Sequence, residues 1–184
     1  MIVRWVRPAY VMAGGLVVAA VGFAALTQVA GPNGLAALVT GYVLFSLGLA
    51  PVFTLATDLI VGTAPPERAG AASAIAETSS ELGGALGIAI LGSIVTAIYR
   101  GAMASAVPAG VPYQAASAAR DTLGGALAAS QQLPDETGAA LLGAAREAFG
   151  QAFETTVIIC AAVALAAAML ATILLRGVGN GHDP

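Results

Sequence analysis

The sequence predicts an all-α, polytopic membrane protein with four transmembrane helices and a helical extracytoplasmic loop. Hydrophobic residues make up 58% of the 184 residues and charged residues only 9%, whereas a soluble domain carries about a quarter charged residues. Four apolar segments are each long enough to cross about 30 Å of hydrocarbon at about 1.5 Å per residue. This composition excludes a water-soluble globule, because too few charged side chains are present to cover its surface.

The first two predicted spans form a hairpin. Residues 8–27 are uncharged and follow a short basic segment. They resemble a signal peptide, but the apolar run is long and no cleavage site follows it, so we expect a retained span. Residues 35–60 form the second span, which Pro51 is expected to kink. The Gly-Pro-Asn-Gly turn at residues 31–34 is tight enough to make the two spans antiparallel neighbours.

The third and fourth spans are predicted at residues 70–99 and 153–175. The third carries two acidic residues, whereas the fourth is uncharged from residue 155 onward. A short proline-containing connection at residues 62–69 is expected to end the second span before the third begins.

A long loop at residues 100–150 separates the last two spans. It is too polar to cross the membrane, yet it is rich in alanine. Leu123, Leu127 and Ser130 recur at helical spacing. Asp135 follows a proline and is placed to cap a second helix that runs into the fourth span. We therefore expect a helical hairpin at the membrane surface.

The distribution of arginines predicts that both termini lie in the cytoplasm. Cytoplasmic loops of membrane proteins carry an excess of Lys and Arg. In this orientation the inner set is Arg4, Arg7, Arg68 and Arg176, and the outer set is Arg100, Arg120 and Arg146. The dense N-terminal flank decides the orientation. We predict a multi-pass protein of the plasma (inner) membrane with the long loop outside and a flexible cytoplasmic tail at residues 177–184.

Two acidic residues lie deep in the third span. Glu77 and Glu81 are one helical turn apart, so they share one face near the middle of the membrane. Ionisable side chains there cost about 2.5–3.5 kcal/mol to insert and usually line a polar path. Ser73, Ser80 and Gly84 complete that path. Because desolvation and mutual repulsion favour proton binding, and the deprotonated pair attracts a cation, the pattern favours proton and cation coupling. The alternative is that each acid pairs with an arginine or reaches an interface.

Two further pairs in this region have structural interpretations. Gly83 and Gly87 form a GxxxG pattern that lets two helix backbones approach closely, so we expect a helix-packing seam. Asp58 lies at the end of the second span, where the helix dipole opposes an acid. We expect Asp58 to form a cytoplasmic ion pair with Arg68, and Arg4 is the alternative partner.

Several other chemistries are poorly supported by the residues present. Cys160 is the single cysteine and lies in an apolar run, and His182 is the single histidine. Metal clusters and nucleophilic triads are therefore improbable, so we expect no enzyme and no metal. The arginines form no cluster that could follow a phosphate backbone, so nucleic-acid binding is not expected.

Residues 56–93 carry a family resemblance. The Pro-Glu-Arg-Ala-Gly turn, followed by Glu-x-x-x-Glu and Gly-Gly-Ala-Leu-Gly, resembles the penultimate-helix region of fourteen-helix drug:proton antiporters of the major facilitator superfamily. The other spans resemble helices eleven, twelve and fourteen. This resemblance implies efflux of hydrophobic, often cationic, compounds in exchange for protons, with Glu77 and Glu81 at the positions of the membrane-embedded acids. No cofactor is implied, because the proton gradient is the energy source.

The resemblance also implies that the chain is incomplete alone. It corresponds to the last four helices, and alternating access needs two half-bundles around a central site. The expected partners are the lipid bilayer, protons, drug-like compounds and the remaining transporter helices. The alternatives are a non-transporting membrane subunit, an inactive truncated remnant, or a small four-helix exporter that acts as a homodimer.

Overall fold

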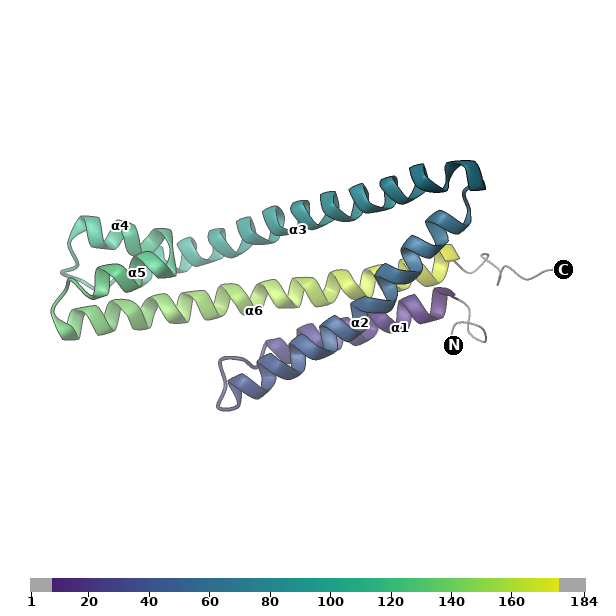
Figure 1. Cartoon of the computed structure of the whole chain (residues 1–184). Coiled ribbons are helices and arrows are strands. Elements are labelled where there is room, and N and C mark those ends of the chain that lie inside the picture. Colours follow the sequence, from purple (N-terminus) through teal and green to yellow (C-terminus); the bar gives the residue numbers. More distant parts are fainter. Residues whose placement is uncertain (1–7, 176–184) are drawn as a thin grey trace. The chain divides into compact units, whose positions relative to one another are not determined.

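The computed structural model describes residues 8–175, and these residues are helical almost throughout, without a β-strand among them (Figure 1). The helices are α1 (Pro8–Leu26), α2 (Gly34–Gly62), α3 (Ala69–Ala106), α4 (Tyr113–Asp121), α5 (Leu123–Ser130) and α6 (Asp135–Leu174), with a short 3-10 turn, η2 (Pro66–Arg68), before α3. Four of the helices are long and apolar enough to cross a membrane. The predicted all-α class with four membrane-length helices is confirmed.

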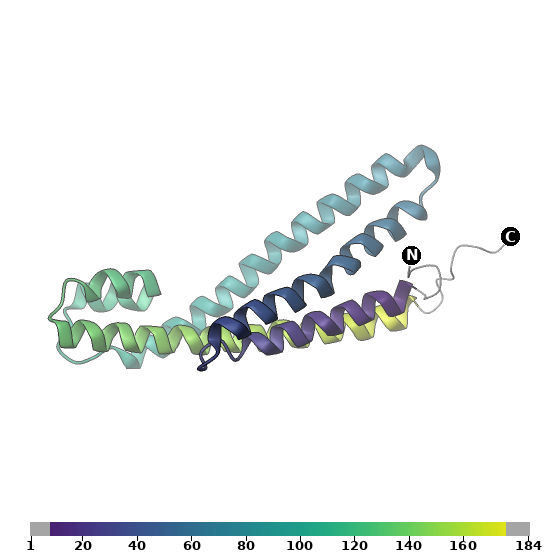
Figure 2. The same ribbon diagram turned by 60° about the horizontal axis from the view of Figure 1, so that its bottom comes forward.

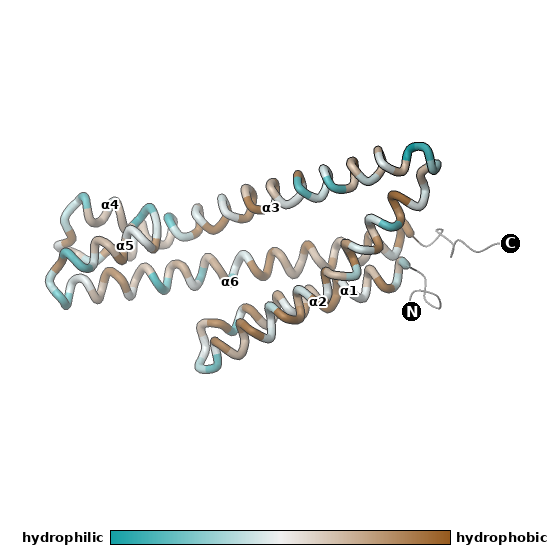
Figure 3. The backbone as a smooth tube through the Cα atoms, in the orientation of Figure 1, coloured by the Kyte–Doolittle hydropathy of each residue, from teal (hydrophilic) through white to brown (hydrophobic). Residues whose placement is uncertain are grey.

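Polar residues are concentrated outside the apolar runs. Figure 3 shows hydrophilic segments at the connection between α2 and α3 and around α4 and α5, and it also shows a polar interruption in the first half of α3. The apolar runs of α1 and α2 are otherwise continuous, and α2 continues through Pro51 to Gly62. The first half of α6 also carries charged residues, but its second half, from residue 155 to Leu174, is uncharged.

Helices α3 and α6 are much longer than the spans expected within them. They have 38 and 40 residues, which corresponds to nearly 60 Å each, about twice the hydrocarbon thickness. The predicted spans at 70–99 and 153–175 cover only the apolar runs. A helix can continue through charged residues once it has left the hydrocarbon, so α3 extends to Ala106 and α6 begins at Asp135.

The segment between the last two spans contains both expected helices, as α5 and as the start of α6, but the rest of it differs from the expected surface hairpin. Its first residues continue α3, its last residues form the first half of α6, and only α4 and α5 are separate helices. Asp135 lies in the first turn of α6 rather than at the cap. The carbonyl of Pro134 accepts from the backbone N–H of Gly138 at 2.8 Å. An acid in the first turn still interacts favourably with the helix dipole.

The chain divides into two compact units, residues 8–84 with 157–175, and residues 85–156. The first contains the α1–α2 hairpin, whose helices lie side by side (Figure 2). A small core in this unit includes Ala13 and Leu16 of α1 and Ala168 of α6. The hairpin predicted from the tight turn is confirmed.

Glycines bring α1 and α2 into backbone contact. A Cβ built on Gly22 would lie 2.5 Å from the backbone nitrogen of Phe45 and 2.8 Å from the carbonyl oxygen of Gly41. A Cβ built on Gly15 would meet the carbonyl oxygen of Gly48. The two helices therefore approach more closely than any residue with a side chain at these positions would allow.

The second unit has a core of its own. Met103 of α3, Ala126 of α5 and Leu141 of α6 are completely buried in it. The Tyr99 hydroxyl donates to the carbonyl oxygen of Ala119 at 2.7 Å. Thr122 caps α5, because its side chain accepts from the backbone N–H of Gly125 at 2.9 Å. Helices α4 and α5 are thereby packed with the ends of α3 and α6 within residues 85–156.

Candidate functional site

Glu77 and Glu81 lie in the first half of α3, so both belong to one continuous helix, as their spacing of four residues requires. They are eight and twelve residues beyond Ala69, the first residue of α3, which is about 12 and 18 Å along the axis. Side chains four residues apart lie on the same helical face. The Ser73 hydroxyl on this face donates to the carbonyl oxygen of Ala69 at 3.1 Å. The acids are thus about halfway along a membrane-length apolar stretch.

The face that carries these acids continues along α3 into a packed region. Val95 and Tyr99 follow Glu77 and Glu81 by 18 residues each, which is five turns of about 3.6 residues. Tyr99 is 3% exposed, and Val95 packs against the same core. The side of α3 that carries the acids therefore continues into a side that packs against protein further along the same helix. A helix side that faces only lipid would not do so.

Both acids are exposed in the described chain, as are Ser73, Ser80 and Gly84. Within residues 8–175 the salt bridge is Arg100 with Asp121, at 3.0 Å. Neither Glu77 nor Glu81 forms one in that range. In the described chain, therefore, no arginine pairs with either acid, in contrast to the alternative considered above. The face that carries the acids is exposed, so a ligand or further helices can reach it. The roles of the acids and of the polar path stay predictions.

The expected cytoplasmic ion pair is not formed in the structure. Asp58 lies near the end of α2 and Arg68 in η2, and both side chains are exposed. Neither makes a salt bridge within the described residues. The short connection between the two residues is not enough to bring their side chains together in this structure. Their pairing stays a prediction for the assembled bundle. Arg4, the other partner considered for Asp58, lies outside the described residues.

The expected packing seam at Gly83 and Gly87 is open in the structure. A Cβ built on either glycine would meet nothing within 4 Å. The close glycine contacts occur instead between α1 and α2, and sequence reasoning missed them. Their signal was a spacing of seven residues on both helices, from Gly15 to Gly22 and from Gly41 to Gly48.

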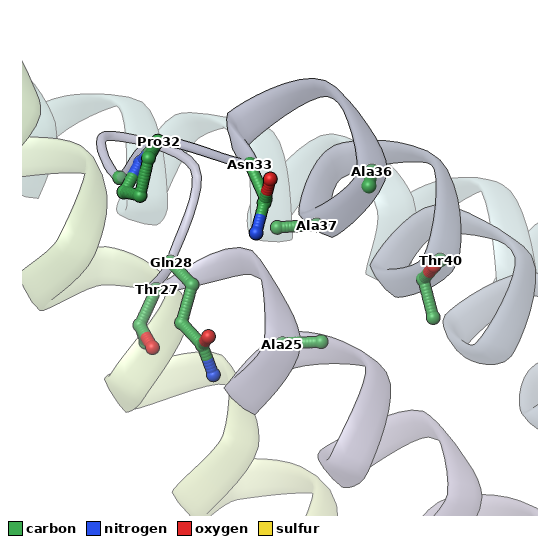
Figure 4. Close-up of a pocket in the computed structure, with 9 residues that line it drawn as sticks. Ala25, Thr27, Gln28, Pro32, Asn33, Ala36, Ala37 and Thr40 are labelled. Atoms are coloured by element: carbon green, nitrogen blue, oxygen red, sulfur yellow. The ribbon is translucent and has the colours of Figure 1, made fainter.

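An open pocket of about 580 Å³ lies at the turn between α1 and α2. Figure 4 shows its lining around the turn, where Gln28, Asn33 and Thr40 supply polar side chains. No lining residue is charged. Neutral amides and hydroxyls can form hydrogen bonds with a ligand, but they cannot neutralise a cation. This pocket is therefore a poorer cation site than the acidic face of α3.

Of the two residues considered for metal or nucleophile chemistry, Cys160 lies in the described part of the chain. Cys160 is half-buried in α6, and His182 lies outside the described residues. Among residues 8–175 no group of three or more His, Cys, Asp or Glu side chains is placed to hold a metal ion.

Curated proteins similar to this chain are bacterial drug efflux and resistance proteins. The multidrug efflux pump LfrA of Mycolicibacterium smegmatis is 38% identical over 92% of this chain and 33% of its own length. The methyl viologen resistance protein SmvA of Salmonella typhimurium is 36% identical over 58% of the chain and 21% of its own length. The tetracenomycin C resistance and export protein of Streptomyces glaucescens is 35% identical over 44% of the chain and 15% of its own length. The resemblance to drug efflux transporters is confirmed.

The chain spans about a third of the length of LfrA and about a fifth of the length of SmvA. No protein-family model and no solved structure matches it. The similarity to LfrA therefore covers nearly all of this chain, and each relative is matched over only one part of its own length.

Proposed function

We propose that this homologue of bacterial multidrug efflux pumps supplies the last four transmembrane helices of a proton-coupled antiporter of the major facilitator superfamily. The observation that carries the proposal is the 38% identity to LfrA over 92% of the chain. The substrates are hydrophobic, often cationic, compounds. The chain is incomplete alone, has no enzymatic activity and binds no cofactor, because the proton gradient supplies the energy.

Glu77 and Glu81 give this proposal a mechanism. Two carboxylates on one face of a helix repel each other when both are ionised, and desolvation adds to that cost. Binding either a proton or a cationic compound relieves both penalties. The two ligands therefore compete for the same face, and a proton taken from the acidic side of the membrane displaces the compound to that side. Such competition is the physical basis of exchange.

The remaining walls of the site come from helices outside this chain. Alternating access in transporters of this kind requires two bundles that rock about a central site. The open acidic face of α3 and the chain's coverage of only 33% of LfrA both support an assembly with further helices. We place the assembly in the plasma membrane, with both termini in the cytoplasm and α4 and α5 outside.

Complementation in a bacterial strain without its own drug efflux pumps tests this function. The chain is expressed alone, and also together with the part of LfrA that it does not match. Accumulation of a fluorescent lipophilic cation is measured with and without a proton uncoupler. We expect no export by either part alone, and uncoupler-sensitive export by the two together.

Two outcomes contradict the proposal. Export by the chain alone would favour the small homodimeric exporter. If the two parts copurify from membranes and still export nothing, the chain is a non-transporting subunit or a remnant. Copurification is the control that separates failed transport from failed assembly.

A further inference from the structure

We propose that the pocket at the turn between α1 and α2 binds the headgroup of a membrane lipid, and that this headgroup is uncharged and rich in hydroxyl groups, as in a neutral glycolipid. The pocket is the one of about 580 Å³ described above. Its level in the membrane, its shape and its chemistry each support this ligand. The site is separate from the acidic face of α3, and lipid binding there does not depend on transport.

The length of α1 places the pocket at a membrane interface. Helix α1 has 19 residues, which is about 28 Å along the axis and close to the hydrocarbon thickness of about 30 Å. Its last residue, Leu26, and the turn that follows therefore lie where the hydrocarbon ends and the lipid headgroups begin. Ala25 and Thr27 from this end of α1 line the pocket, together with Ala36 and Thr40 from the start of α2. Lipid headgroups are thus the most abundant candidate ligands at this level.

The pocket continues into an apolar surface. A second pocket, of about 590 Å³, shares part of the same lining and adds Leu35 and Val39. The shared residues are Pro32, Asn33, Ala36 and Thr40. The side chains of Leu35 and Val39 are both more than half exposed. A lipid can therefore place its headgroup against the polar lining and the start of an acyl chain against these two residues, whereas a fully polar solute would leave them uncovered.

The lining of both pockets carries no charge. None of the lining residues is Arg, Lys, Asp or Glu. Sites for anionic lipid headgroups use basic side chains, and a charge that is taken out of water without a counter-charge is costly. The pocket therefore disfavours both an anionic lipid and a cationic compound.

Two side-chain amides are available to a ligand. Figure 4 shows Gln28 and Asn33 extending toward the space between the end of α1 and the start of α2. Asn33 forms no capping hydrogen bond with α2, and within residues 8–175 the Gln28 side chain has no hydrogen-bond partner either. The Thr27 hydroxyl, by contrast, donates to the carbonyl oxygen of Ala24 at 2.7 Å. Because an amide group both donates and accepts, it matches the hydroxyl groups of a sugar, which do the same.

Thr40 adds a hydroxyl group nearer to the hydrocarbon. It lies six residues beyond Gly34, the first residue of α2, which is about 9 Å along the axis. Thr54 of the same helix donates to the carbonyl oxygen of Ala50 at 3.1 Å, whereas Thr40 forms no hydrogen bond in the described part of the chain. A polar group without a partner is costly where water is scarce. The sugar and the ester groups of a glycolipid supply partners at this depth.

Native mass spectrometry of the purified full chain tests this ligand. Digalactosyl diacylglycerol, phosphatidylcholine, phosphatidylethanolamine and phosphatidylglycerol with the same acyl chains are titrated separately into the chain in an oligo-oxyethylene detergent. We expect the Kd of the glycolipid to be about tenfold lower than that of each phospholipid, because only its headgroup is uncharged and can pair with both amides. Equal affinity for all four lipids, or a preference for any phospholipid, would overturn the inference.

Two substitutions test whether the lipid binds in this pocket. Gln28→Leu and Thr40→Val remove polar groups with little change in shape, and each should weaken glycolipid binding about three- to tenfold. Gln131→Leu and Thr54→Val are the matched controls, because neither residue lines the pocket, and they should leave the Kd unchanged. Equal weakening by substitutions and controls would place the lipid elsewhere and contradict the assignment. If a variant unfolds, the comparison of lipids on the unsubstituted chain still decides.

Two further measurements separate the lipid from other occupants of the pocket. We expect a fluorescent lipophilic cation not to displace the bound glycolipid, and displacement would assign the pocket to the transported compound instead. The lipid titration is also repeated on the chain copurified with the part of LfrA that it does not match, where we expect the same glycolipid affinity. Loss of binding there would show that the added helices cover the pocket, which also contradicts the inference. None of these results depends on export, so failure of the lipid site and failure of the transport proposal are distinguishable.

Discussion

Single residues of α3 have two different settings. Glu77 and Glu81 lie in an apolar segment without a salt-bridge partner in the described residues. Tyr99, five turns beyond Glu81, is 3% exposed and donates its hydroxyl hydrogen to Ala119. The first setting favours exchange of ligands, and the second favours a fixed contact. Substitutions at these positions should therefore affect different measurements.

The acids are tested by removing their charge without changing their shape. We expect Glu77→Gln with Glu81→Gln to abolish pH-driven export of a cationic dye by the complemented transporter. Each single substitution should reduce it about ten- to hundredfold, because an interaction with a charged group contributes about 1.5–3 kcal/mol. Glu147→Gln, on the charged half of α6, is the matched control. Normal export by the double variant would rule out the proposed coupling role.

The contact of Tyr99 is tested by its stability. Tyr99→Phe leaves the buried carbonyl of Ala119 without its donor, so we expect a loss of about 1–3 kcal/mol in the free energy of unfolding. Asp121→Asn breaks the exposed Arg100–Asp121 salt bridge, which should cost less than about 1 kcal/mol. Thermal unfolding of the purified chain in detergent gives both values. Equal losses in the free energy of unfolding would show that the buried hydrogen bond stabilises the chain no more than the exposed salt bridge does.

The sequence locates these charges but not their contacts. Glu77 and Glu81 are detectable because charges are rare in the apolar runs. The acceptor of Tyr99 is a backbone carbonyl 20 residues away, and no residue type marks it. Asp58 and Arg68 show the converse, since complementary charge and short separation predict a pair that the described residues do not form.

At the level of elements, the existence of each long helix was more predictable than its limits. Uncharged runs locate the spans because the hydrocarbon selects against charge. Beyond the hydrocarbon, alanine-rich sequence supports a helix with or without charges. The ends of α3 and α6 therefore depend on the next helix breakers, such as Pro134 before α6, and not on the apolar run.

The close glycine contacts between α1 and α2 give a test at the level of elements. Gly48→Ala places a Cβ against the backbone of α1, so we expect a loss of about 1–3 kcal/mol in stability, as for other overpacked sites. Gly14→Ala is the matched control on α1, because its Cβ would meet nothing within 4 Å. Thermal stability in detergent should fall for the first variant only. A similar fall for both would contradict close packing at Gly48.

Over the whole molecule, the sequence predicts the helical class and the resemblance to efflux transporters, and the similarity to LfrA confirms that resemblance over 92% of the chain. It does not predict which helices touch, apart from the α1–α2 hairpin. Alanine and glycine permit many tight contacts of similar energy, so the choice among them depends on the complete assembly.

The orientation of the molecule is tested by reporter fusions. Because arginines favour the cytoplasmic side, a reporter active only in the cytoplasm should be active after Pro184, and one active only in the periplasm should be inactive there. The same periplasmic reporter fused after Gly110, between α3 and α4, should be active. Periplasmic activity after Pro184 would invert the proposed topology.

The packed unit of residues 85–156 has a practical consequence for imaging. Membrane transporters offer few features that rise above a detergent micelle, which makes their particle images hard to align. Helices α4 and α5 are held by a buried hydrogen bond and a common core, and in the proposed topology they lie outside the membrane. An antibody fragment raised against this unit would be a rigid fiducial marker, with which electron microscopy could resolve the proposed assembly.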